Sequence, residues 1–346
     1  MTHPTQRKCW LAATVGIAAA AVMLVVAAAA GPAAAGIGDI LRSVRDRMGQ
    51  VLLGRDVLAT PGEEVALHAS LRGGFRLDGV EGVRIQFHLD ERRIDQLTSD
   101  SDGNVRTRWT APAEPGNYAI RVRVKPDDQP EEEDRQVEAA RLLVAVRKAE
   151  TPLAVVDLDK TLVASGFATV LLGGTSAEPM AGSQAVLARL AGTTTIVYLT
   201  HRPDFLGPKS KKWLDTHKYP VGPLLTSSLG GLLEGSGTFK TERLAALKKT
   251  FPNLKVGIGD KVSDAQAYAT LGMTSILIPD VDWSDDDAED FEEKAAEIAA
   301  LPESVQVATT WADVSAILFD GATRPKGPVV QRLRGIARDL RRRDRD

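Results

Sequence analysis

The hydrophobic pattern of this 346-residue chain changes its period at Thr151, and this change is the strongest constraint on the fold. Between about Gly54 and Lys148, apolar residues alternate with polar ones, and turn sequences such as DSDGN and APAEPGN interrupt the alternation. Alternation with a period of two is typical of strands that bury one face. Several such strands without a helical period predict an all-β antiparallel sandwich. The expected strands are residues 63–71, 83–90, 105–111, 117–125 and 140–148.

After Thr151, short apolar runs alternate with amphipathic segments of helical period. This order predicts an α/β domain in which helices cover both faces of a parallel sheet. The expected strands are 153–159, 193–200, 222–227, 255–260 and 275–280, and the expected helices are 183–191, 209–217, 241–251, 265–272 and 289–301. In such sheets, ligands bind beyond the carboxyl ends of the strands. Polar residues follow three of these ends, namely Asp157 with Asp159, Thr200, and Asp260.

The first of these strand ends carries two like charges. In the sequence VVDLDKTL, Asp157 and Asp159 stand two residues apart, and residues i and i+2 of an extended segment point to the same side. Two neighbouring carboxylates repel each other unless a cation lies close to them. The pair therefore predicts a cationic group at this end of the strand.

Four motifs of the α/β domain resemble, in order, those of the haloacid dehalogenase (HAD) phosphatase superfamily. They are VVDLDKTL, YLTHRP, Lys240 before a helix, and GIGDKVSD. The resemblance covers residues 151–320 and implies a HAD-like (Rossmannoid) fold that hydrolyses phosphate esters through an aspartyl-phosphate. It implies that Asp157 is the nucleophile and that Asp159 is the acid and base.

The same resemblance implies a phosphate site and a metal site. Thr200 and Lys240 would bind the phosphoryl oxygens, and His201 and Arg202, which follow the threonine, are further candidates for substrate contact. Mg²⁺ would be held by Asp157, by the backbone carbonyl of Asp159 and by Asp260, while Asp264 would support the metal or the lysine. Mg²⁺ prefers hard oxygen ligands such as these.

Each motif residue also has a purely structural interpretation. Asp159 can cap the following turn, Thr200 can cap a helix, Lys240 can be a solvated residue at a helix start, and Asp264 can be a helix N-cap. Two other functions compete with phosphatase activity. One is a non-catalytic cell-surface binding module with a HAD-shaped domain, and the other is dehalogenation, which needs neither a metal nor Asp159.

Residues 198–227 and 239–268 are similar to the lipin-type, phosphatidate-phosphatase-like branch of the superfamily. The chain departs from that branch at Lys160, where glycine is common, and at His201, where small residues are common. About twenty residues separate Thr161 from the helix expected at 183–191, too few for the helical cap of many HAD enzymes. An open site suits a bulky phosphate ester such as a lipid, a phosphorylated polymer or a protein.

Residues 98–124 resemble part of a bacterial immunoglobulin-like domain. This resemblance implies a fold for residues 50–149 and names no chemistry. The domain is interpreted as a spacer or packing module, with adhesion or substrate presentation as the alternative.

Both ends of the chain predict an association with membranes. Residues 1–36 combine a basic start with an uncharged, alanine-rich run, which indicates a signal peptide or, alternatively, a retained membrane anchor. Either one predicts an exported protein that is periplasmic, secreted or anchored to the outer face of the cytoplasmic membrane. The tail, 324–346, is rich in arginine and has an apolar helical stripe at Val329, Leu333, Ile336 and Leu340.

The tail has two interpretations. It can bind anionic lipid, or it can be a docked or solvated terminal helix. The formal net charge of the whole chain is −3, which gives no argument for a nucleic acid as a partner.

Overall fold

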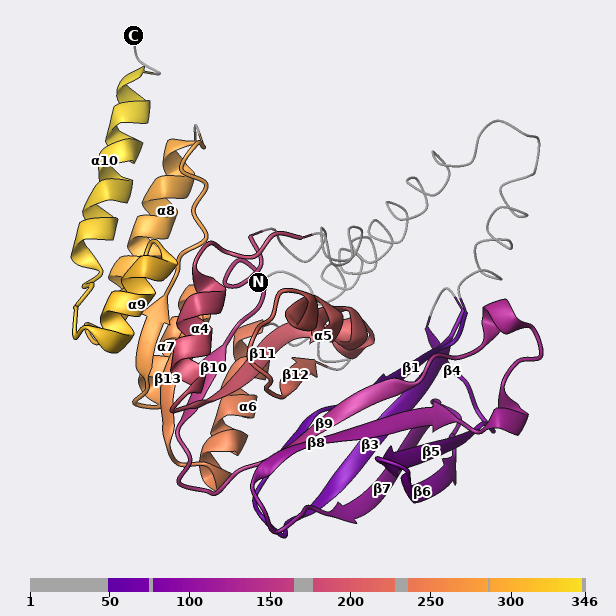
Figure 1. Ribbon diagram of the computed structural model, residues 1–346. Helices are drawn as coiled ribbons and strands as arrows, with labels where there is room; N and C mark the ends of the chain where they lie inside the picture. The colour runs from indigo at the N-terminus through magenta and orange to yellow at the C-terminus, as the bar shows by residue number, and fades with distance from the viewer. Residues whose placement is uncertain (1–48, 75–76, 165–176, 228–235, 286, 344–346) are drawn as a thin grey trace, which may run out of the picture.

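The computed structural model describes residues 49–74, 77–164, 177–227, 236–285 and 287–343 (Figure 1). A β-rich part is followed by an α/β part with a parallel sheet, as the sequence predicts. The signal or anchor expected in residues 1–36 lies outside the described residues. Among the described helices, none is both long and apolar enough to cross a membrane.

Two sheets form the β-rich part. The first joins β1 (Val51–Gly54), β3 (Glu64–Gly73), β4 (Asp78–Gly79) and β7 (Asn104–Thr110). The second has the order β2-β9-β8-β5-β6, formed by β2 (Val57–Ala59), β9 (Ala140–Val146), β8 (Gly116–Val124), β5 (Arg84–Leu89) and β6 (Arg92–Thr98). Apolar side chains from both sheets share one core, including Leu67 and Leu71 of β3 and Phe87 of β5.

All five strands expected in this part are present, as β3, β5, β7, β8 and β9. The expectation of a purely antiparallel sandwich is wrong in one place, because β2 pairs with β9 in parallel, Val57 opposite Val144. Periodicity missed β1, β2 and β4, which have four residues or fewer, and β6, whose RRIDQLT sequence has no buried residue. The immunoglobulin-like assignment stays a prediction.

The α/β part has a six-stranded parallel sheet of order β12-β11-β10-β13-β14-β15. Its strands are β10 (Leu153–Val156), β11 (Thr195–Pro203), β12 (Leu224–Ser227), β13 (Leu254–Gly259), β14 (Thr274–Leu277) and β15 (Gln306–Val307). All four residues of β10 are buried, since helices cover both faces. Ala154 and Val156 enter one core, whereas Leu153 and Val155 enter the core on the opposite face.

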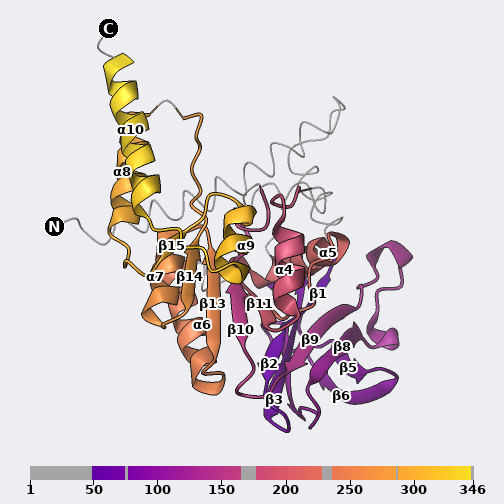
Figure 2. The ribbon, with the colours of Figure 1, turned by 60° about the vertical axis from the view of Figure 1, so that its left-hand side comes forward.

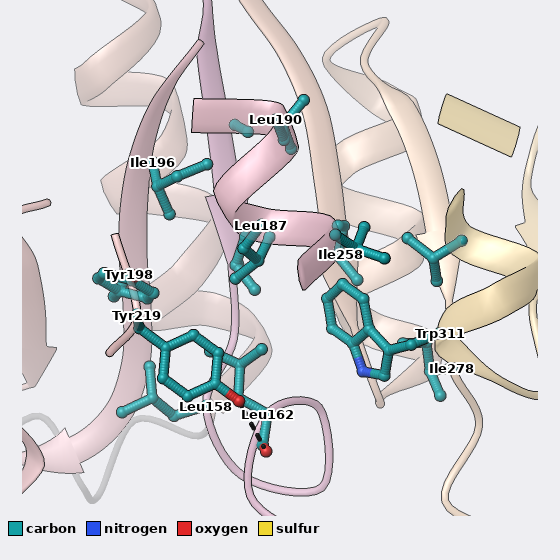
Figure 3. Packing of buried hydrophobic residues seen from close by; sticks show 14 of the residues in the cluster. Leu158, Leu162, Leu187, Leu190, Ile196, Tyr198, Tyr219, Ile258, Ile278 and Trp311 are labelled. Atoms are coloured by element: carbon teal, nitrogen blue, oxygen red, sulfur yellow. Dashed lines mark hydrogen bonds between the residues drawn. The ribbon is translucent and has the colours of Figure 1, made fainter. Parts of the chain in front are cut away.

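The helices form the outer layers of this part (Figures 1 and 2). The first face is covered by α4 (Ser183–Ala191), α5 (Gly207–Thr216) and α9 (Trp311–Phe319), and the opposite face by α6 (Ser236–Thr250) and α7 (Val262–Thr270). Figure 3 shows the first core, where Leu187 and Trp311 pack over the sheet and the Tyr219 hydroxyl lies 3.5 Å from the Leu162 carbonyl oxygen. This contact holds the loop that follows β10.

The sequence interpretation overlooked α9 and β15. A capping box at Thr310 and Asp313 begins α9, and this Thr-x-x-Asp spacing is a readable signal for a helix start. With only two residues, β15 is too short for a periodic signal.

The C-terminal segment is part of the α/β core. Helix α10 (Gly327–Arg343) packs beside α8 (Ala288–Ala299), and in both ribbon views the pair extends past the sheet. Val329 and Leu333 of the expected stripe are buried, and Ile336 and Leu340 pack against them. The docked alternative is therefore correct, and the apolar stripe is not available to a membrane.

Asp56 joins the two parts of the chain. Its side chain is 2% exposed and accepts hydrogen bonds from the backbone amides of Leu143 in β9 (2.7 Å) and Leu224 in β12 (2.9 Å). The Lys211 ammonium group on α5 lies 2.6 Å from the same carboxylate. β12 is an edge strand, and the backbone amides of an edge strand can pair with a strand of another molecule. The hydrogen bond from the Leu224 amide to Asp56 prevents such pairing at this position.

Replacing Asp56 with alanine should strongly destabilise the protein. The change leaves two amides and one ammonium group without their buried acceptor, which should lower the free energy of unfolding by roughly 3–5 kcal/mol. Urea unfolding followed by circular dichroism measures this loss. The control is Glu64→Ala, which removes an exposed ion pair with Arg108 and should cost less than about 1 kcal/mol. Equal losses in the two variants would contradict the proposed role of Asp56.

Candidate active site

Three carboxylates meet at the carboxyl edge of the parallel sheet. Asp157 directly follows β10, Asp260 directly follows β13, and Asp264 lies in the first turn of α7. All three residues are buried, and one oxygen from each lies within 4.8 Å of the others. The fold thus brings together residues more than one hundred positions apart, as expected for parallel strands that end at the same edge.

Lys240 of α6 is the cation that faces this cluster. Its ammonium nitrogen lies 2.6 Å from Asp264 Oδ2 and 3.1 Å from Asp157 Oδ1. The side chain is almost wholly buried, so the interpretation of Lys240 as a solvated helix-start residue is wrong. Asp264 is not a helix N-cap either, because Lys261 has that position and the Asp264 carboxylate binds Lys240.

Two glycines in β13 allow the close approach of α7. A Cβ atom at Gly257 would lie 2.1 Å from the Tyr268 ring, and one at Gly259 would lie 2.7 Å from Asp264 Oδ2. Any larger residue at these two positions would push α7 away from the sheet. The sequence GIGD therefore sets the position of Asp264 as well as that of Asp260.

The crowding of like charges changes the pKa values of the cluster. Burial, and then repulsion from Asp157 and Asp264, raise the pKa of Asp260 to about 8. Burial also raises the pKa of Asp264, although Lys240 opposes this effect. For Lys240, burial alone would lower the pKa, but Asp157 and Asp264 outweigh it and the net pKa is raised. Lys240 therefore stays charged, while Asp260 holds a proton that a second cation would displace.

The cluster fits a divalent cation. One oxygen of Asp260 and one of Asp264 are buried without a hydrogen-bond partner among the described residues. Buried oxygens of this kind, converging from three carboxylates, are the donor set that Mg²⁺ prefers. The Asp159 carboxylate is not part of this cluster, and the contribution of its backbone carbonyl to a metal site stays a prediction.

Asp159 is paired with Arg202 instead. Arg202 Nε donates to Asp159 Oδ2 at 2.8 Å, and Nη2 donates to Oδ1 at 2.6 Å. The arginine side chain is 1% exposed, whereas that of Asp159 is 24% exposed. Asp159 is therefore the member of the pair that is open to a substrate, and Arg202 lies behind it.

Thr200 and His201 lie in β11, which continues to Pro203. The interpretation of Thr200 as a helix cap is therefore wrong. Thr200 is buried, and its hydroxyl oxygen accepts a hydrogen bond from the Arg202 amide at 3.2 Å, an arrangement that leaves its own proton for another acceptor. His201 is half-buried, and its carbonyl oxygen accepts a hydrogen bond from Ser227.

A groove of about 650 Å³ opens beside Asp260, between α7 and α8. Its lining is mixed, with the charged and amide side chains of Lys261, Gln266, Asp280, Lys294 and Glu297 beside the apolar Val262, Ala300 and Leu301. Lys160, which has a left-handed backbone (φ 56°), reaches to 3.5 Å from Asp280. The groove offers room for a polar group next to the carboxylate cluster. The prediction of a capless site falls partly on residues 165–176, which lie outside the described residues.

Residues 154–278 match the family model of the LNS2 domain of PITM 1-3. The matched segment begins in β10 and ends after β14, so it contains the carboxylate cluster, Lys240, Thr200 and Arg202. The match supports a HAD-like phosphatase domain in this part of the chain. No curated protein matches the chain.

Several solved structures are similar to portions of this chain at low sequence identity. D,D-heptose 1,7-bisphosphate phosphatase from B. bronchiseptica, crystallised with magnesium and phosphate, is 19% identical over 49% of this chain and 99% of its own (TM-score 0.37). The CARDB domain of the PF1109 protein from Pyrococcus furiosus is 14% identical over 29% of this chain and 94% of its own (TM-score 0.21). The Yersinia pseudotuberculosis adhesin InvE is 16% identical over 33% of this chain and 31% of its own (TM-score 0.22).

The pKa of Asp260 predicts how the stability of the metal-free protein depends on pH. An unfolded aspartate titrates near ~4, whereas folded Asp260 titrates at about 8. Between these values the folded state holds the extra proton, so the free energy of unfolding should fall as the pH rises. Asp260→Asn should remove the decrease in the free energy of unfolding that Asp260 causes between these pH values. Mg²⁺ should raise the melting temperature of the wild type and should not raise that of the variant.

Thermal melts in EDTA and in Mg²⁺ at several pH values measure both effects. Asp78→Asn, at an exposed position in β4, is the control and should retain the wild-type behaviour. An Asp260→Asn variant with the wild-type pH slope and Mg²⁺ response would contradict the assignment.

Proposed function

We propose that the α/β part is a Mg²⁺-dependent phosphomonoesterase of the HAD type, acting through an aspartyl-phosphate on a phosphatidate-like lipid or another bulky phosphate ester. The observation that carries this proposal is the contact of the Lys240 ammonium group with both Asp157 and Asp264, beside an Asp260 oxygen that has no hydrogen-bond partner in the part of the chain that the structure describes. A structural ion pair needs one carboxylate for one cation. A third buried carboxylate makes sense where another cation and an anionic substrate meet.

The proposed reaction gives Asp157 and Asp159 the roles that the resemblance to HAD phosphatases implies. An Asp157 oxygen attacks phosphorus, the ester P–O bond breaks, and its electron pair stays on the leaving oxygen, which takes a proton from Asp159. Water then attacks the phosphorus of the aspartyl-phosphate while Asp159 accepts a proton from that water. The bond to Asp157 breaks, which releases inorganic phosphate and restores both residues.

The remaining residues bind and orient the phosphoryl group. The Thr200 hydroxyl can donate to a phosphoryl oxygen, and Lys240 offsets negative charge beside the nucleophile. Mg²⁺, held by Asp157 and Asp260, would supply electrostatic neutralisation that lets an anionic nucleophile approach an anionic ester. Asp264 acts through Lys240, since its carboxylate fixes the ammonium group.

The substrate class rests on the groove and on the family match. The groove beside Asp260 has both charged and apolar side chains, so it suits a bulky leaving group that has polar and apolar parts. The match to an LNS2 domain supports the lipin-type, phosphatidate-like class, and the exposed arginines of α10 offer attraction for an anionic surface. An exported location, in contact with lipid, is part of the same proposal.

The alternative function is a non-catalytic binding module with a HAD-shaped domain. It shares the phosphate-binding residues and differs in having no turnover. Asp159 discriminates between the two, because a module that only binds phosphate gains nothing from a partly exposed carboxylate at the mouth of the site. Dehalogenation is less well supported, because it uses neither Asp159 nor a metal.

Substitution of the two motif aspartates should separate chemistry from folding. Asp157→Asn should abolish hydrolysis, and Asp159→Asn should reduce it by the ~10²–10⁴-fold that a general acid contributes. EDTA should abolish hydrolysis by the wild-type protein, and added Mg²⁺ should restore this activity. Steady-state assays with a soluble alkyl phosphate such as glycerol phosphate, whose leaving oxygen needs a proton, measure all three effects, and the exposed Asp339→Asn is the control. Turnover by Asp157→Asn, or full activity in EDTA, would refute the mechanism.

The lipid hypothesis predicts that exposed charge on α10 promotes binding to vesicles. Truncating α10 would uncover the buried Leu333, so neutralising its exposed arginines is the cleaner test. Arg338→Gln with Arg342→Gln should weaken sedimentation with phosphatidate-containing vesicles roughly 30-fold, at about 1 kcal/mol for each basic residue near the surface. Hydrolysis of a soluble ester should not change.

The matched control is Arg92→Gln with Arg93→Gln, which removes the same charge from the exposed face of β6. Equal vesicle binding by both double variants, or faster hydrolysis of small sugar phosphates than of vesicular phosphatidate, would discard the lipid substrate and leave the phosphatase proposal in place.

A further inference from the structure

Arg202 has three contacts that fix its guanidinium group. Two of its nitrogens donate to the two oxygens of Asp159, and the third, Nη1, donates to Ser210 Oγ on α5 at 2.9 Å. The backbone amide of the same residue donates to the Thr200 hydroxyl. One residue therefore holds both the predicted acid and the predicted phosphate-binding threonine.

The burial of Arg202 argues against direct contact with a substrate. The sequence places it two residues after the motif threonine, which makes it a candidate phosphate ligand. In the structure its side chain is 1% exposed, and its donors point to Asp159 and Ser210. A phosphoryl group at the mouth of the site would meet Asp159 first.

The geometry of the pair restricts Asp159 more than a single contact would. Two parallel N–H···O bonds from a planar guanidinium group fix the plane of a carboxylate as well as its position. Rotation of the Asp159 carboxylate about its Cβ–Cγ bond would break at least one of them. General acid catalysis depends on such alignment, since a proton is transferred only over hydrogen-bond distance.

A purely structural interpretation of the pair is also available. A buried arginine needs a counterion, and Asp159 supplies one. On that interpretation, loss of Arg202 would reduce the amount of folded protein and would affect every substrate alike. Positioning of the acid would instead affect those substrates whose leaving oxygen needs a proton.

We propose that Arg202, held by Ser210, is a positioning residue that aligns Asp159 with the leaving oxygen of the substrate. This inference rests on the proposed phosphatase function and deepens it. Arg202 contacts the predicted acid and not the carboxylate cluster, so its effect on the substrate passes through Asp159.

The test compares two esters that differ in their need for an acid. p-Nitrophenyl phosphate has a leaving group that departs as an anion, whereas glycerol phosphate has an alkoxide leaving group that must be protonated. Arg202→Lys retains the positive charge and loses the bidentate hydrogen bonding to Asp159. We expect kcat/KM to fall about 10- to 100-fold for glycerol phosphate and less than about 3-fold for p-nitrophenyl phosphate, a fraction of the full contribution of a general acid. Asp159→Asn should show the same selectivity with a larger loss.

Two further variants complete the experiment. Ser210→Ala removes the third contact and should give a smaller loss with the same preference, which keeps the test decisive if Arg202→Lys folds poorly. Arg324→Lys weakens an arginine–aspartate pair that is not part of the site, with Asp313, and should leave the hydrolysis of both substrates unchanged. Circular dichroism and melting temperatures show whether each variant is folded.

The outcomes separate this inference from the proposed function. If the wild type hydrolyses neither ester in Mg²⁺, the proposed function is wrong and the role of Arg202 fails with it. If the wild type is active and the folded Arg202→Lys and Ser210→Ala variants lose activity equally on both esters, or gain activity on glycerol phosphate, only the positioning role is overturned.

Discussion

Three carboxylates, those of Asp157, Asp260 and Asp264, meet at the edge of the sheet, and the ammonium group of Lys240 contacts two of them, Asp157 and Asp264. Parallel topology causes this crowding, since it places the ends of β10 and β13 and the start of α7 at the same edge. Buried like charges are costly unless they are neutralised. Lys240 contacts two of the three and neutralises one negative charge, and a second charge is avoided when Asp260 keeps its proton, which leaves one net negative charge. A second cation would remove this constraint, so the charge balance that limits stability also favours metal binding.

The two motif aspartates have different electrostatic environments, although only one residue separates them. Asp157 is buried against Lys240, whereas Asp159 is partly exposed and paired with Arg202. A nucleophile and an acid that act in sequence need different environments, and catalytic carboxylates in general differ in function because their surroundings differ. The left-handed conformation of Lys160 comes directly after this pair, where the chain turns away from β10.

Much of the fold and the cluster could be predicted from the sequence because the signals are local. Strand ends that carry Asp157, Thr200 and Asp260 are visible in the apolar pattern, and parallel pairing brings them together. The partner of Asp159 could not be predicted, because the direction of the Arg202 side chain depends on Ser210 and on α5. Docking of α10 was also open, since an apolar stripe with arginines around it is compatible with a membrane surface or with α8. Only tertiary packing decides between these.

Helix α5 connects the β-rich part to the predicted acid. Lys211 contacts Asp56 of the β-rich part, and the preceding residue, Ser210, holds Arg202. The Arg55 guanidinium group, 2.7 Å from Asp204 just before α5, adds a second contact between the two parts. Ser210 and Lys211 are neighbours in α5, so the contact with the β-rich part and the contact with Arg202 lie on the same turn of one helix. The interpretation of residues 50–149 as a packing module is therefore better supported than that of a spacer, since a spacer would have no reason to bury Asp56 against β12 and α5.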